Sequence, residues 1–167
     1  MSEIHHVGYV VEDLEAAAHE AARTLGAGPF FLIDHVAFAE LTYLDAPAAY
    51  DHSAAFGRWG PILMELNQVF SADPPELHAA LGTPGLGHVG WLADDLDAER
   101  ARLEASGMRC FHTGRTGPVA AAWFDGTPVL GHHVEVLQRA APLAGFHAMV
   151  RDAGEGWDGR DPFRPWA

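Results

Sequence analysis

The chain has 167 residues, 49% of them apolar, and a formal net charge of −13 with the histidines neutral. This length suits one compact domain or two fused half-size modules with a sizeable core. All ten basic residues are arginine, and so acidic a balance argues against a nucleic-acid partner and against an anionic membrane surface.

The first 70 residues predict the element order β-α-β-β-β. A β-branched and aromatic strand covers residues 4–11, and Asp13 then caps a helix that ends at Gly26. Three extended segments follow the helix. These segments are 29–41, 48–59 and 61–70.

The rest of the chain divides into three parts. Residues 71–84 contain two adjacent prolines and further Gly and Pro, which predicts a linker with at most a short helix. Residues 85–138 repeat the order of the first module, with Asp95 as the helix cap. We expect residues 139–167 to form an amphipathic helix and an extended tail. The predicted organisation is thus a first module at 1–70, a linker, a second module and a C-terminal extension.

The two modules share sequence as well as order. The segment IHHVGYVVEDLEAA from Ile4 and the segment GLGHVGWLADDLDAE from Gly85 align without a gap, so that His6 falls on His88. The module ends also match, because MELNQ and VEVLQ each carry one carboxylate, Glu65 and Glu135, inside an apolar strand. A repeat of this length predicts a fold built from two copies of one unit.

The repeat selects four side chains, His6, Glu65, His88 and Glu135. A carboxylate in an apolar strand is costly to bury unless it is paired or bound to a metal. A single histidine on an apolar strand is more often a satisfied core residue, but the duplication favours a metal site. Two imidazoles and two carboxylates suit a divalent ion such as Ni, Co, Zn, Mn or Fe, and on an octahedral ion they leave open positions for a substrate.

These features resemble the vicinal oxygen chelate superfamily, which includes glyoxalases, methylmalonyl-CoA epimerases, extradiol dioxygenases and bleomycin resistance proteins. The resemblance covers about residues 3–138 and is carried by HHVGYVVEDLE, ILMELNQ, GHVGWLADDLD and HHVEVLQ. It implies an α+β fold in which two tandem βαβββ modules form a cupped mixed β-sheet, with helices outside and a metal between the modules. It also implies a homodimer.

Residue by residue, the resemblance makes His6, Glu65, His88 and Glu135 the metal ligands, and either glutamate a catalytic base as well. The full set is nearest to bacterial glyoxalases, because the epimerases usually carry Gln at the position of Glu65 and the dioxygenases generally have no ligand there. His133 should project to the same strand face as Glu135. It is a candidate proton carrier or substrate contact, with a polar residue at the rim of the cup as the alternative.

Three functions remain open. The sequence predicts a metal-dependent isomerase, epimerase or lyase that stabilises an enolate during proton transfer next to a carbonyl of a small-molecule substrate. The alternatives are a metal-dependent dioxygenase on the same site and a non-catalytic, small-molecule-binding protein of the resistance type. His5 and His132 should face the opposite side of their strands. The segment FDGTPVLGHH departs from the glyoxalase motif. No usable pattern is found for six other histidines: His19, His35, His52, His78, His112 and His147.

The sequence also predicts the compartment. No apolar run approaches the roughly 18 residues of a membrane-spanning helix, and the N-terminal residues lack the features of a secretory signal. Cys110 is the single cysteine, so no intrachain disulfide can form, and a small core residue is its expected role. We therefore expect a cytoplasmic protein.

Overall fold

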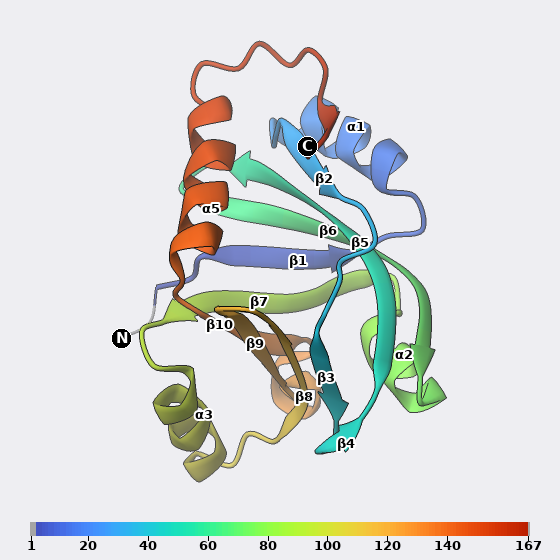
Figure 1. Cartoon of the computed structure of the whole chain (residues 1–167). Coiled ribbons are helices and arrows are strands. Elements are labelled where there is room, and N and C mark those ends of the chain that lie inside the picture. Colours follow the sequence, from blue (N-terminus) through green and yellow to red (C-terminus); the bar gives the residue numbers. More distant parts are fainter. Residues whose placement is uncertain (1–2, 167) are drawn as a thin grey trace.

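A computed structural model describes residues 3–166 (Figure 1), so residues 1–2 of the predicted first module and residue 167 of the predicted tail lie outside the described residues. The strands are β1 (His6–Val10), β2 (Phe30–Ile33), β3 (Glu40–Tyr43), β4 (Ala46–Pro47), β5 (Ala49–Trp59), β6 (Ile62–Asp73), β7 (Gly85–Ala93), β8 (Cys110–Thr116), β9 (Val119–Phe124), β10 (His133–Gln138) and β11 (Phe163–Pro165). The helices are α1 (Leu14–Leu25), α2 (Pro75–Leu81), α3 (Leu96–Ala105), α4 (Thr127–Leu130) and α5 (Ala141–Ala153). Within residues 3–166, no helix is both long and apolar enough to cross a membrane.

All the described strands form one mixed sheet in the order β11-β2-β5-β6-β1-β7-β10-β9-β8-β3-β4. The first strands of the two modules, β1 and β7, lie side by side and antiparallel at its centre. Each pairs on its other side in parallel with the last strand of its own module, β1 with β6 and β7 with β10. The predicted α+β fold with a cupped mixed sheet is therefore confirmed.

The helices α1 and α3 occupy equivalent places in the two modules. Asp13 accepts a hydrogen bond from the Ala16 amide and Asp95 accepts one from the Ala98 amide, both at 2.9 Å, as the sequence predicts. Gly26 ends α1 in the left-handed conformation, with φ of 65°. Both helices pack on the outside of the sheet, against strand residues that alternate with the two glutamates.

That alternation determines where the glutamates point. Met64 and Leu66 on β6 are buried beneath α1, and Val134 and Val136 on β10 are buried beneath α3. Because successive side chains of a strand lie on opposite faces, the residues between them point to the other, concave face. The two glutamates therefore point into the cup.

The segment at 29–41, predicted as one extended element, is divided between the two modules. β2 ends at Ile33, and after a loop β3 pairs with β8 of the second module and forms a hairpin with β4. The physical reason is the apolar surface of β3 and of the loop before it, because Phe38, Leu41 and Tyr43 pack in the core cluster that contains Phe111. The first module thus contributes a hairpin to the wall of the second.

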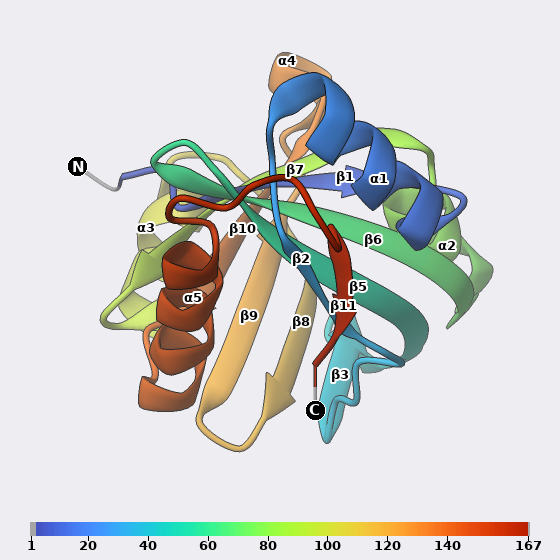
Figure 2. The same cartoon turned by 90° about the horizontal axis from the view of Figure 1, so that it is seen from above.

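The C-terminal residues cover the concave face of the first module. Phe146 and Val150 of α5 are buried against Phe56 of β5 and Leu63 of β6. Figure 1 shows α5 crossing the ends of these strands, and Figure 2 shows β11 running beside β2. The predicted amphipathic helix therefore fills one half of the cup.

Candidate metal centre

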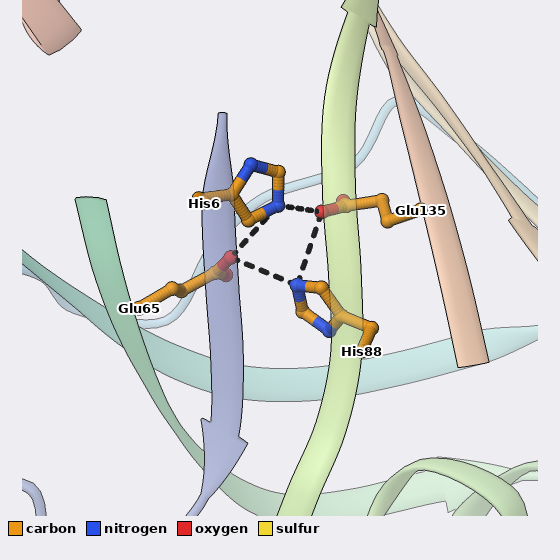
Figure 3. Close-up of side chains that lie close together, drawn as sticks. All are labelled: His6, Glu65, His88 and Glu135. Atoms are coloured by element: carbon orange, nitrogen blue, oxygen red, sulfur yellow. Dashed lines mark hydrogen bonds and ion pairs between the residues drawn. The ribbon is translucent and has the colours of Figure 1, made fainter. Parts of the chain in front are cut away.

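The four side chains selected by the repeat converge on the concave face (Figure 3). One ligand atom from each of His6, Glu65, His88 and Glu135 lies within 4.8 Å of the other three, and all four residues are buried. The Nε2 atom of His6 lies 2.6 Å from Glu135 Oε2 and 3.6 Å from Glu65 Oε2. The Nε2 atom of His88 lies 3.1 Å from the Oε2 atom of each glutamate.

The strand register places these residues in two rows across the centre of the sheet. The rows are Glu65–Gly8–His88 and His6–Gly90–Glu135. A Cβ atom on Gly8 would lie 2.1 Å from Cε1 of His88, and a Cβ atom on Gly90 would lie 2.1 Å from Cε1 of His6. Only glycine leaves room for the imidazole at these two positions.

The electrostatics of the cluster require a positive charge between the two carboxylates. Burial by itself would raise the pKa of Glu135, but the charge of His88 and hydrogen bonds with both imidazoles lower it below its usual range. Burial would lower the pKa of His88, but the charge of Glu135 and the hydrogen bonds with Glu135 and Glu65 raise it to about 10. Two carboxylates and two imidazole nitrogens that face one buried point fit a divalent transition metal ion.

A cavity of about 660 Å³ opens beside this cluster. Glu65 and His88 line it, together with residues of α2 and of the turn between β3 and β4. On the first module's half of the concave face, α5 packs against Phe56 and Leu63. Glu65 is thus the carboxylate of the cluster that faces the cavity.

The structure places His133 in the wall of this cavity, next to His88 on the neighbouring strand. Its Nε2 atom donates to the carbonyl of Ala80 on α2 at 3.1 Å, and its ring lies 4.6 Å from that of Phe111. Its Nδ1 atom has no hydrogen-bond partner among the described residues, and Asp125 Oδ1 lies 3.7 Å from it. Burial lowers the pKa of His133, which favours a neutral imidazole.

Sequence reasoning missed His52 on β5. Its side chain lines the cavity with only 6% exposure, and its ring stacks on Tyr50 at a centroid distance of 4.2 Å. Its Nδ1 atom lacks a hydrogen-bond partner within residues 3–166. Burial lowers the pKa of His52 to about 4, so the imidazole is neutral. The available signal was the apolar run of the strand after it, in which Ala54 and Phe56 share its face.

Comparison with known proteins agrees with this architecture. Residues 5–127 match the family described as the Glyoxalase/Bleomycin resistance protein/Dioxygenase superfamily. No curated protein matches the chain by sequence.

Three solved structures have a similar fold. Methylmalonyl-CoA epimerase from Mycobacterium tuberculosis is 19% identical, with a TM-score of 0.56 over 85% of this chain and 91% of that chain. A hypothetical protein from Bacillus halodurans is 12% identical, with a TM-score of 0.58 over 83% of this chain and 95% of that chain. A methylmalonyl-CoA epimerase in complex with methylmalonyl-CoA and NH4+ is 16% identical, with a TM-score of 0.50 over 84% and 96% of the two chains. At these identities the likeness shows a shared fold.

Proposed function

Because the chain belongs to the glyoxalase/bleomycin resistance protein/dioxygenase superfamily, we propose that it is a metal-dependent isomerase, epimerase or lyase that moves a proton next to a carbonyl of a small-molecule substrate. The observation that carries the proposal is the convergence of His6, Glu65, His88 and Glu135 within 4.8 Å beside a cavity. Buried carboxylates are costly unless they are paired or coordinate a metal, and four such groups that face one point beside a cavity support a metal site.

The chemistry that a divalent ion supplies is the stabilisation of an enolate oxygen, which lowers the cost of removing the adjacent proton by several kcal/mol. His6, Glu65, His88 and Glu135 would hold that ion. Of the two glutamates, Glu65 lines the cavity, so we assign to it the removal and return of the proton. Glu135 lies 2.6 Å from His6 and is assigned to ligation.

The remaining groups of the wall bind and orient the substrate. His133 lies beside His88 and presents a buried ring to the cavity, which supports a role as a substrate contact. Helix α5 buries the first module's half of the concave face and keeps water from that side of the cluster. Exclusion of water strengthens every electrostatic interaction at the reacting atoms.

The test begins with metal content, measured by plasma mass spectrometry on dialysed protein. We expect about one divalent ion per chain, lost in His6→Ala and in Glu135→Ala. The matched control is His19→Ala, because His19 lies on the outer face of α1 with a side chain that is 56% exposed. Loss of metal in the control as well would point to a general effect of histidine removal.

Metal-loaded protein is then tested for deuterium incorporation from D2O into 2-substituted acyl-CoA thioesters and ketones. Exchange that is lost in Glu65→Gln supports the assigned base. Oxygen uptake without exchange would instead favour the dioxygenase alternative. Absence of metal after incubation with Ni, Co, Mn, Fe and Zn would contradict the proposed function and favour a binding protein.

A further inference from the structure

Aromatic rings form much of the cavity wall beside the metal centre. Within the described part of the chain, the rings that line the cavity besides that of His88 are Tyr43, Tyr50, His52, Phe111, Trp123, His132 and His133. The ring of Tyr50 stacks on that of His52, with centroids 4.2 Å apart and planes 22° from parallel. Phe111 lies 4.6 Å from His133. The cavity wall therefore consists of flat rings that pack against one another.

A further buried ring, that of His112, packs against the rings of this wall. His112 is 1% exposed, lies 4.5 Å from Trp123 and 5.8 Å from Tyr50, and its Nδ1 atom donates to the carbonyl of Thr42 on the β3–β4 hairpin at 2.9 Å. The two sides of the wall, which belong to different modules, are thus joined through one buried histidine. A wall of rings that is already in place costs a ligand little conformational entropy.

Charged side chains contribute little to the same cavity. Apart from the histidines, the charged residues that line it within residues 3–166 are Glu65, Arg109 and Asp125. Glu65 belongs to the metal centre, and Arg109 is an exposed residue. Because burial lowers the pKa of His52 to about 4, its ring adds no cation. A polyanionic ligand in this cavity would therefore have a single arginine, Arg109, as a cationic contact within residues 3–166.

We propose that the substrate of this site carries a flat, uncharged ring next to its reacting carbonyl, and that the ring lies between the walls formed by Tyr50, Phe111 and Trp123. This inference rests on the proposed function, since the metal centre is what places the carbonyl end. The cavity of about 660 Å³ lies in the range that encloses a drug-sized ligand. Aromatic pairs contribute more binding free energy than their buried area alone predicts. The wall would therefore select ligands that carry an aromatic ring rather than ligands that carry a charge.

The experiment uses two probes with the same chelating group, acetohydroxamate and benzohydroxamate, which differ by a methyl against a phenyl group. Their affinities for nickel-loaded protein are measured by calorimetry and divided by their affinities for free Ni2+. We expect benzohydroxamate to bind at least about tenfold more tightly after this correction. A succinyl hydroxamate, which carries a carboxylate, should bind no more tightly than acetohydroxamate.

Two tyrosine variants test whether the preference for benzohydroxamate arises from the proposed cavity wall. Tyr50→Leu removes a ring of the wall and should reduce the preference for benzohydroxamate by about threefold or more. Tyr9→Leu is the control, because Tyr9 packs in the cluster beneath α1, away from the cavity. The Tm of each variant verifies that it is folded, and the wild-type comparison of the probes does not depend on either variant.

The outcomes separate the two proposals. Nickel uptake with equal corrected affinities for the two probes would overturn the ring-bearing substrate and leave the proposed function standing. An equal loss of preference in Tyr9→Leu and Tyr50→Leu would overturn the assignment to this wall. Failure to bind nickel or any other divalent ion would overturn the proposed function and this inference with it.

Discussion

The imidazole ring of His6 lies against Gly90 of the neighbouring strand, at a distance that leaves no room for a side chain. A Cβ atom on Gly90 would lie 2.1 Å from Cε1 and 2.2 Å from Nε2 of His6. The same relationship joins His88 and Gly8 in the opposite direction. The repeated His-Val-Gly segment is thus a reciprocal fit, in which the glycine of each module accommodates the histidine of the other.

Substitution of this glycine tests the fit. We expect Gly90→Ala to displace the His6 ring and to weaken the binding of a divalent ion by about 10- to 100-fold, as loss of a supporting contact around a ligand typically does. The affinity is measured by competition with a chromophoric chelator. Gly145→Ala is the control, because Gly145 is an exposed residue of α5 whose Cβ would meet nothing within 4 Å. Unchanged affinity in Gly90→Ala would contradict the fit.

Metal binding should depend on pH. Although burial opposes it, Glu135 and Glu65 raise the pKa of His88 to about 10 in the metal-free protein, so below that pH a proton must leave before the imidazole can bind an ion. Apparent affinity should therefore fall as pH falls, by up to about tenfold per unit when one proton is displaced. Titrations at about pH 8 and pH 6, with release of the proton monitored in weak buffer, measure this slope. Affinity that is the same at both pH values would show that metal binding displaces no proton from His88.

The buried ring of His52 costs stability. Its Nδ1 atom has no hydrogen-bond partner within residues 3–166, and a buried polar atom without a partner costs about 1 kcal/mol or more. We expect His52→Phe to raise the free energy of unfolding by about 1 kcal/mol, because a phenyl ring keeps the stacking on Tyr50 and has no polar atom. Urea unfolding of the metal-free protein measures the change. His19→Phe, at an exposed position, should leave stability unchanged, and a decrease in His52→Phe would show that the nitrogen is satisfied.

The C-terminal helix should contribute strongly to stability. Phe146 is 9% exposed and packs edge-to-face on Phe56, with centroids 5.4 Å apart. Phe146→Ala should lower the free energy of unfolding by about 3 kcal/mol, because it leaves a cavity between α5 and the sheet. Val129, which is 88% exposed, provides the contrast, since Val129→Ala should change stability by less than about 0.5 kcal/mol. Equal effects of the two variants would show that α5 is loosely packed.

Much of the candidate site could be predicted because the duplication links residues that are far apart in sequence. The match of His6 with His88 identified two first strands, and the match of Glu65 with Glu135 identified two last strands. Helix starts were also predictable, since Asp13 and Asp95 form their hydrogen bonds with amides only three residues away. Local hydrogen bonds and period-two burial are properties of short segments, and short segments are what one sequence shows directly.

The sequence could not show which segments form the walls of the cup and of the cavity. His52 is part of the wall because β5 places it beside β6, and β3 belongs to the second module because its apolar side chains find Phe111 there. Both facts depend on packing between segments that share no pattern in the sequence. The predicted amphipathic α5 had an apolar face, but only the fold showed that this face fills the first module's half of the cup.

By itself, then, the sequence determined a two-module α+β fold with a paired set of His and Glu residues, because the repeat and the alternation of side chains are written along the chain. The tertiary structure decided that the four groups meet at one point, that Glu65 rather than Glu135 faces the cavity, and that rings wall the space beside it. The physical reason is that distances across a sheet follow from register and curvature, which arise only when the strands pair and the core packs.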